Sequence, residues 1–145
     1  MGLDCYLRYI PKKTLEDAAK ARCCSLPQAT LVVPKAHYSR YELAYWRGHR
    51  NLNRWMRELY RQKYLEEDHQ ELPIGSLSVI LDEADIMALK LEMMFGFLTN
   101  SGSGMGWVYD TAEDRMVPPD DMPVLDRVLR IIRNNCSYVY YISSW

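Results

Sequence analysis

The hydrophobic and polar positions of this chain follow two periods, about two residues in some stretches and about 3.6 residues in others. Runs of alternating, β-branched or aromatic residues predict strands, and apolar residues spaced three or four apart predict amphipathic helices. The predicted strands are Gly2–Ile10, Ala29–Val33, Ser76–Leu81, Trp107–Asp110 and Ser137–Ser143. The predicted helices are Thr14 to about Cys23, Tyr41–Tyr64, Glu83 to about Phe95 and Asp121 to about Asn134.

Capping residues set the predicted helix starts. Thr14 opens a Thr-x-x-Asp capping box, and Ser39 is the predicted N-cap of the longest helix. Asp82 caps the next helix, and Asp121, followed by Pro123 in the first turn, caps the last one.

These elements predict one α+β domain over residues 1–145. A chain of 145 residues is long enough to bury a core and short enough to form one domain. Both ends are predicted strands, so we expect them to be built into the sheet. The predicted fold is a small mixed sheet with paired terminal strands, packed on the long central amphipathic helix and on two or three shorter helices.

The predicted helix Tyr41–Tyr64 is strongly aromatic and basic. At about 100° per residue, its apolar and basic side chains separate onto opposite sides. The apolar side consists of Tyr41, Ala44, Tyr45, Gly48, Leu52, Trp55, Met56 and Leu59. The basic side consists of Arg47, Arg50, Arg54, Arg57 and Arg61, with Trp46 and Tyr64 at its border. Guanidinium groups beside an indole suit an anionic aromatic ligand, but an ordinary solvated helix face has the same pattern.

Charge is strongly separated along the sequence, although the net charge is only −1. The segment Lys35–Lys63 holds eight Lys and Arg against two Asp and Glu, whereas Glu66–Asp126 holds two against fourteen. This separation suggests an anionic partner on one face, or head-to-tail contact between subunits of a homo-oligomer. The acidic segment would repel a phosphate backbone, which disfavours duplex DNA as a partner.

The sequence predicts a cytoplasmic protein without a membrane partner. The first residues lack the basic start and apolar run of a signal peptide, and no apolar run approaches the ~20 residues of a membrane span. Met1-Gly2 resembles a myristoylation start, but position six is Tyr6 rather than Ser or Thr. The four cysteines lack C-x-x-C spacing, so we expect them to be reduced and structural.

Catalytic and metal-binding motifs are not evident. His37, His49 and His69 are scattered, and no nucleophile motif or metal-ligand spacing accompanies them. The glycines of Thr99–Gly106 lack the lysine and the following helix of a phosphate loop. The sequence therefore predicts no metal and no cofactor, and it favours binding over catalysis.

Three local patterns resemble a family of small, largely uncharacterised proteins, many of them encoded by bacteriophages. They are the opening MGLDCYL, the segment ELAYWRGHRNLNRW and the ending YYISSW; the family begins MGLDMYL, has a YWRK-type helix and closes on SSW. Gly48 stands where the family usually has Lys, and TNSGSGMGW replaces an aromatic-rich stretch. The resemblance implies a phage origin and brings no established activity. The matching residues are Met1, Gly2, Leu3, Asp4, Tyr6, Leu7, Tyr45, Trp46, Arg47, Trp55, Ser143, Ser144 and Trp145.

The same patterns predict a binding site. If the terminal strands pair, the two ends of the chain lie together, and the start of the long helix can pack over them. Aromatic rings would then stack on a base, guanidinium groups would bind phosphate, and hydroxyls would bind ribose. The alternative is that these residues form a core junction. The predicted ligand-binding residues are Asp4, Tyr6, Tyr45, Trp46, Arg47, His49, Arg50, Ser143, Ser144 and Trp145.

Three functions are compatible with the sequence. The first is a phage-type counter-defence protein that acts in the infected bacterial cell by binding, and sequesters a nucleotide-derived host immune signal. The second is a protein–protein inhibitor of a host defence effector, similar in action to an anti-CRISPR protein. The third is a small nucleotide- or RNA-processing enzyme with His49 as a base.

Overall fold

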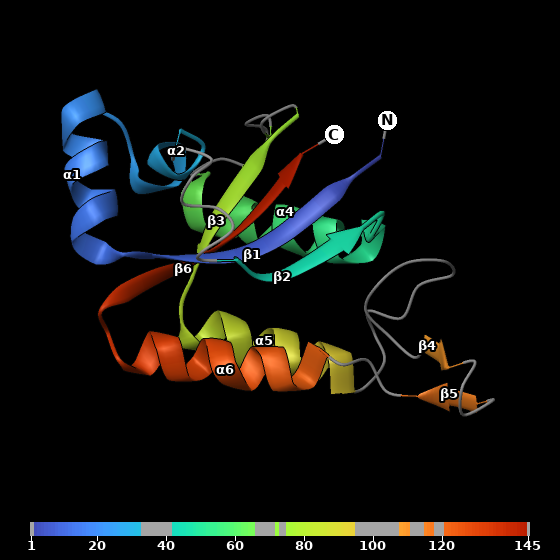
Figure 1. The fold of residues 1–145 in the computed structure, drawn as a ribbon. Helices are drawn as coiled ribbons and strands as arrows, with labels where there is room; N and C mark the ends of the chain where they lie inside the picture. Colours follow the sequence, from blue (N-terminus) through green and yellow to red (C-terminus); the bar gives the residue numbers. More distant parts are fainter. Residues whose placement is uncertain are drawn as a thin grey trace.

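The computed structural model describes residues 2–32, 42–65, 72, 75–94, 108–110, 115–117 and 121–144. A four-stranded sheet has the order β2-β1-β6-β3, so strands from the two ends of the chain form its middle (Figure 1). Its strands are β1 (Asp4–Pro11), β2 (Glu42–Arg47), β3 (Leu77–Leu81) and β6 (Ser137–Ser144). The described helices are α1 (Lys12–Arg22), α2 (Leu26–Thr30), α4 (Arg50–Tyr64), α5 (Glu83–Met94) and α6 (Asp121–Arg133). Strands β4 (Val108–Asp110) and β5 (Arg115–Val117) pair separately.

The predicted α+β class and the pairing of the terminal strands are confirmed. Strands β1 and β6 are aligned over their full lengths, from Asp4 opposite Ser144 to Pro11 opposite Ser137. The sheet differs from the predicted mixed sheet in that β1–β2, β1–β6 and β3–β6 are all antiparallel. The position of β6 explains this difference, since it lies between β1 and β3 and runs opposite to both.

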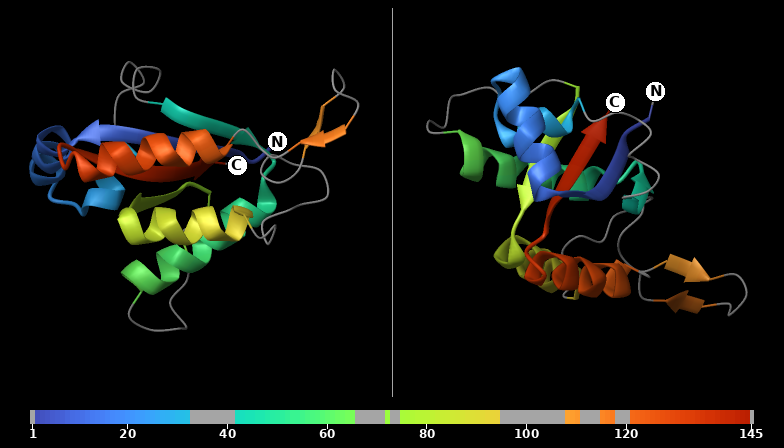
Figure 2. Two further views of the ribbon diagram at one scale, coloured as in Figure 1. Left: turned by 90° about the horizontal axis from the view of Figure 1, so that it is seen from below. Right: turned by 60° about the vertical axis from the view of Figure 1, so that its left-hand side comes forward.

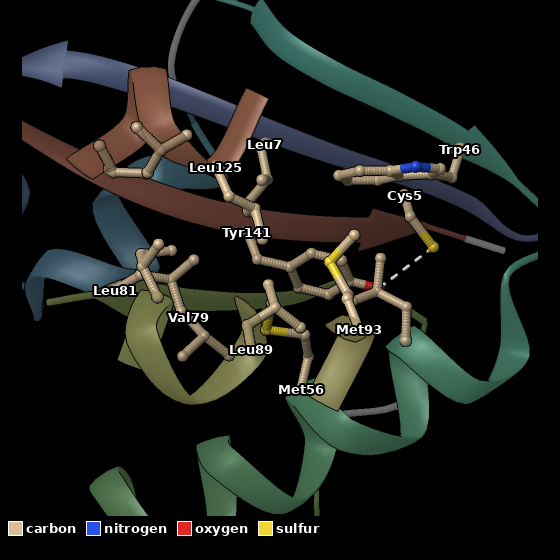
Figure 3. Close-up of a cluster of buried hydrophobic side chains, with 14 of the residues drawn as sticks. Cys5, Leu7, Trp46, Met56, Val79, Leu81, Leu89, Met93, Leu125 and Tyr141 are labelled. Atoms are coloured by element: carbon tan, nitrogen blue, oxygen red, sulfur yellow. Dashed lines mark hydrogen bonds between the residues drawn. The ribbon is translucent and has the colours of Figure 1, made fainter. Parts of the chain in front are cut away.

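The larger core lies on one face of the sheet, beneath α4, α5 and α6. Figure 2 shows α5 and α6 side by side, and Figure 3 shows their side chains meeting those of the strands. Odd-numbered residues of β1 enter this core because side chains alternate across a strand. Fully or nearly fully buried members are Leu3, Cys5, Leu7, Trp46, Leu52, Met56, Leu77, Val79, Leu81, Ile86, Leu89, Met93, Leu125, Val128, Leu129, Val139 and Tyr141.

A smaller core lies on the opposite face, beneath α1 and α2. It contains Ile10, Leu15, Ala19, Ala29 and Tyr140. Helix α1 lies at the end of the sheet farthest from the chain termini (Figure 1), and α2 packs against β3, where the Thr30 hydroxyl meets that of Ser78. Helix cover on this face therefore comes from α1 at one end and from α2 along β3, and no other described helix packs there.

The single helix predicted over Tyr41–Tyr64 is wrong in its first third. Residues Glu42–Arg47 form edge strand β2, and the helix begins at Arg50. Gly48 separates the two elements with a φ of 72°, a left-handed conformation that ends the strand. His49 then caps α4, because its Nδ1 accepts a hydrogen bond from the Leu52 N–H at 3.1 Å. The proposed cap Ser39 lies outside the described residues.

The strand predicted at Ala29–Val33 is also wrong for residues 29–32, and Val33 lies outside the described residues. Residues Leu26–Thr30 form the short helix α2, which a capping box starts. The Ser25 hydroxyl accepts from the Gln28 N–H, and the Gln28 side chain accepts from the Ser25 N–H. Helix α1 likewise begins at Lys12, directly after Pro11, so Thr14 lies within it and does not cap it.

The other predicted elements are close to those observed. Strand β3 and helices α5 and α6 lie where periodicity placed them. The α5 cap is reciprocal, with the Asp85 N–H bound to Asp82 Oδ1 and the Asp82 N–H bound to Asp85 Oδ2, each at 2.9 Å. Residues 95–107, which include the glycine-rich loop and the first residue of the strand predicted at Trp107–Asp110, lie outside the described residues. No helix in the described part of the chain is long and apolar enough to cross a membrane.

Candidate functional site

The candidate site is the part of the sheet face beyond α1 and α2, next to the chain termini. Even-numbered residues of β1 point to this face because the odd-numbered ones fill the larger core. Asp4 and Tyr6 of β1 lie opposite Arg47 and Tyr45 of β2. Ser144 of β6 lies on the other side of Asp4. We call these five residues the terminal platform.

The two tyrosines of the terminal platform form an aromatic pair. The Tyr6 and Tyr45 ring centroids are 5.0 Å apart with an interplanar angle of 36°. The Arg8 guanidinium lies 4.2 Å from the centroid of the Tyr6 ring, a cation–π geometry. Glu42 holds Arg8 from the other side at 4.0 Å. The Tyr45 side of the pair is open to solvent, since that residue is 47% exposed.

A hydrogen bond fixes the exposed tyrosine. The Tyr45 hydroxyl donates to Asp4 Oδ1 at 2.7 Å. This bond to a carboxylate raises the pKa of Tyr45, so the phenol stays protonated and remains a donor. Burial likewise raises the pKa of Tyr6. The pair therefore offers neutral rings at all physiological pH values.

Arg47 supplies the positive charge of the terminal platform. It is exposed and forms no ion pair with any residue that the structure describes. Its side chain passes over Gly2, where a Cβ would lie 3.4 Å from Arg47 Nε. Arg47 lies two residues after Tyr45 in β2 and therefore shares its face of the sheet. A guanidinium group binds phosphate or carboxylate through two parallel hydrogen bonds.

The other predicted site residues are not on the terminal platform. Trp46 is 6% exposed and points into the larger core, so its indole is not presented to a ligand on this face. Ser143 is buried on the same core side. Arg50 is exposed at the start of α4, and Trp145 lies outside the described residues.

His49 is completely buried and does not reach the surface. Burial lowers its pKa to about 4, so the imidazole is neutral at pH 7. Because Nδ1 accepts the hydrogen bond that caps α4, the proton is on Nε2, and Nε2 is buried without a hydrogen-bond partner. The structure gives this residue a capping role, and solvent cannot reach it as a general base in this conformation.

A buried polar cluster lies under the terminal platform, on the core side of the sheet. The Tyr141 hydroxyl lies 2.9 Å from Asn53 Oδ1 and 3.1 Å from Cys5 Sγ (Figure 3). Burial raises the pKa of Cys5 and of Tyr141, so both are protonated at neutral pH. An activated nucleophile requires the opposite shift. This cluster joins β1 and β6 to α4 and supplies no thiolate.

Two other described surfaces, a cavity beside β3 and the arginine row of α4, differ from the terminal platform. Within the described ranges, no three His, Cys, Asp or Glu side chains are placed to hold a metal. A cavity of about 170 Å³ lies beside Ser76 and Ser78 of the β3 region, lined also by Pro27, Gln28, Leu31 and Tyr60. The predicted arginine row of α4 is partly neutralised, since Arg61 pairs with Glu58 at 3.7 Å. Neither combines rings and charge as the terminal platform does.

Asp4, Tyr6 and Ser144 come together through the predicted pairing of the terminal strands, whereas Tyr45 and Arg47 reach them from strand β2 and not from the predicted helix. Arg8 and Glu42 were not predicted. Arg8 was detectable, because it lies two residues after Tyr6 in an alternating strand and must share its face. Glu42 was not, because a bulge between Leu7 and Arg8 shifts the β1–β2 register and brings it opposite Arg8.

Comparisons with known proteins returned no match to a protein-family model, to a curated protein or to a solved structure.

Proposed function

We propose that the chain is a binding protein for a nucleotide-like anionic ligand, held on the terminal platform. The observation that carries the proposal is the Tyr6–Tyr45 pair, open on the Tyr45 side and flanked by the exposed Arg47. A base stacked on an aromatic side chain contributes about 1–3 kcal/mol, and a guanidinium adds a charge-assisted contact to phosphate. Asp4 and Ser144 place a carboxylate acceptor and a hydroxyl side by side on β1 and β6, next to the aromatic pair, where ribose hydroxyls can bind.

The biological form of the proposal is counter-defence, in which the protein sequesters a nucleotide-derived signal of the infected host. It is supported by the placement of the three sequence patterns that resemble phage-encoded proteins. They fall on β1, on β2 with the start of α4, and on β6, and these three strands are neighbours in the sheet. All five residues of the terminal platform are among the matching residues, and the other matching residues include Leu3, Leu7 and Trp46 of the larger core beneath it.

Isothermal titration against a panel of cyclic dinucleotides, cyclic mononucleotides and ADP-ribose derivatives tests this function. We expect saturable binding of at least one member. Tyr45→Ala and Arg47→Ala should each weaken it about tenfold or more, because each removes a contact worth roughly 1–3 kcal/mol. Arg54→Ala, which removes the same charge from the exposed side of α4, is the matched control and should bind as the wild type does.

No binding of any panel member at high protein concentration would end the nucleotide proposal. If Arg54→Ala and Arg47→Ala weakened ligand binding equally, the ligand would contact α4 and the assignment of the site to the sheet would be wrong. If Tyr45→Ala bound the ligand as tightly as the wild type, the base would not stack on the Tyr45 ring.

A protein–protein inhibitor is the second candidate, and a separate surface favours it. Met87 and Leu91 on the outer side of α5 are 43% and 50% exposed, and Ala84 and Ala88 beside them are also exposed. Two turns of apolar helix surface are suited to a protein partner. A host protein that is retained by Arg47→Ala but lost by a Met87→Glu/Leu91→Glu double variant would support this function. The reverse pattern would exclude α5 as its docking surface.

A further inference from the structure

The two edge strands of the sheet, β3 and β2, differ in how their outward backbone groups are covered. At the β3 edge, the Ile80 N–H donates to the Tyr64 hydroxyl at 3.0 Å. Lys63 Nζ donates to the Ile80 carbonyl at 2.6 Å and also pairs with Asp85. Side chains of α4 thus occupy the outward N–H and C=O groups of Ile80 in this strand. Such protection prevents pairing with another chain.

The outward groups of β2 follow from the hydrogen-bond alternation of an antiparallel sheet. The Gly48 N–H donates to the Leu3 carbonyl at 2.6 Å. In an antiparallel ladder every second residue pair is hydrogen-bonded, so the Cys5–Trp46 and Leu7–Ala44 pairs are hydrogen-bonded as well. Tyr45 and Arg47 belong to the intervening pairs and direct their N–H and C=O groups away from β1. The hydrogen bond from the Lys12 N–H to the Cys136 carbonyl shows that the even-numbered residues of β6 pair with β1. The odd-numbered residues of β6 therefore pair with β3, and Ile80 of β3 directs its N–H and C=O groups outward, as observed.

The β2 edge has no side-chain cover comparable to that of β3. Between residues that the structure describes, no backbone hydrogen bond reaches the outer side of Tyr45 or Arg47. The bulge that disturbs the β1–β2 register lies near Leu43, so the regular part of the edge is Ala44 to Arg47. In Figures 1 and 2, β2 is the outermost strand on its side of the sheet.

We propose that a second copy of the chain pairs with this edge, antiparallel and centred on Trp46. In this register Tyr45 lies opposite Arg47 of the second copy, and Arg47 lies opposite its Tyr45. All outward N–H and C=O groups of the two residues are then paired in both copies. The pairing also places the acidic end of β2, at Glu42, toward the basic end of the other strand, which carries Arg47 and Arg50. A register shifted toward Glu42 would use the bulged residue, and one shifted toward Gly48 would set Tyr45 opposite His49, whose carbonyl already accepts a hydrogen bond from the Asn53 N–H.

The second copy completes the terminal platform. Cross-strand neighbours share one face of a sheet, so Arg47 of the second copy lies beside the exposed ring of Tyr45. Each aromatic pair then has Arg8 at one end and the guanidinium of the second copy at the other. This composite site, which rests on the proposed function, takes a ligand with a stacking base and a phosphate that reaches across the two-fold axis. A short strand edge buries little area, so we expect a weak dimer that such a ligand strengthens.

Directed disulfide formation tests the register. In a background with the accessible cysteines replaced (Cys23→Ser, Cys24→Ser, Cys136→Ser), one protein carries Tyr45→Cys and another, with a distinguishing tag, carries Arg47→Cys. Hydrogen-bonded cross-strand partners have Cα atoms about 5.5 Å apart, within disulfide reach. Each residue is about 8 Å from its own counterpart in this register, beyond the limit of about 7 Å.

We expect the oxidised mixture to give a disulfide-linked heterodimer, and each protein alone to remain at its monomer mass of about 17.1 kDa. Circular dichroism verifies that each variant is folded. Cross-linking of either protein with itself, no cross-linking in the mixture of folded variants, or a wild-type monomer mass by sedimentation at every attainable concentration overturns the proposal. A monomer that still binds a nucleotide would leave the proposed function standing, whereas a dimer that binds none would remove that function and leave the pairing.

Discussion

At the scale of single residues, His49 shows how a predicted site residue can have a structural purpose. Its neutral imidazole replaces the Ser, Thr, Asp or Asn that usually caps a helix. The cap fixes the first turn of α4, which contributes Leu52 to the larger core, and the imidazole is fully buried. Protonation would remove the acceptor and place a charge in an apolar environment.

Stability should therefore depend on pH through His49. Its pKa is about 4 in the folded chain and about 6.5 when unfolded. The unfolded chain binds the extra proton between these values, so the free energy of unfolding is fully retained above pH 6.5 and falls as the pH decreases toward 4. We expect a loss of about 2 to 3 kcal/mol over this window. Urea unfolding at several pH values measures it.

The His49→Asn variant is the control for the other titrating groups. Asn caps helices well and does not titrate, so its pH dependence should lack this component. Identical pH profiles for the variant and the wild type would show that His49 is not buried as described.

At the scale of elements, the junction of β2 and α4 explains the largest error of the sequence prediction. The run ELAYWR is compatible with both periods, because Ala44 and Tyr45 fit the predicted apolar helix stripe, whereas Leu43, Ala44 and Trp46 fit one face of a bulged strand. The deciding residue is Gly48, which was assigned to a helix face although glycine is a frequent breaker. The capping box Ser25–Gln28 was equally readable in the sequence, since Pro27 stands in the first turn.

Gly48→Ala should destabilise the fold by about 1–2 kcal/mol, because residue 48 has a φ of 72° and a Cβ strains this conformation. Chemical denaturation measures the change. Gly2→Ala is the matched control, since a Cβ there meets only the side chain of Arg47, at an ordinary contact distance. Equal stability of the two variants would contradict the assigned conformation of the junction.

At the scale of the whole molecule, the fold depends on bringing the two ends of the chain together. The sequence was sufficient for this feature, because both ends alternate strongly and no polar tail precedes or follows them within the 145 residues. It was also sufficient to bring Asp4, Tyr6 and Ser144 together, because the pairing of the terminal strands decides their placement. It could not say which side of the sheet Trp46 and Ser143 occupy, because strand register decides that, and a shift of one residue reverses every side chain.

Amide hydrogen exchange should map this organisation. The slowest amides should be those of β1 and β6, which have a partner strand on each side. Within β2, the Ala44 and Trp46 amides face β1 and should be protected, whereas those of Tyr45 and Arg47 should exchange faster in dilute solution. Protection of Tyr45 and Arg47 equal to that of Trp46 in dilute samples would mean that the outward assignment is wrong.

The closeness of the chain ends has a practical consequence. Gly2 lies against the Arg47 side chain, and Ser144 lies opposite Asp4 at the end of the same strand row. A purification tag or fluorescent protein fused at either end emerges next to the terminal platform (Figure 1). Such a fusion would crowd a ligand on the terminal platform, so cleavable tags are preferable. A small dye attached near residue 2, by contrast, would report on occupancy directly through its emission.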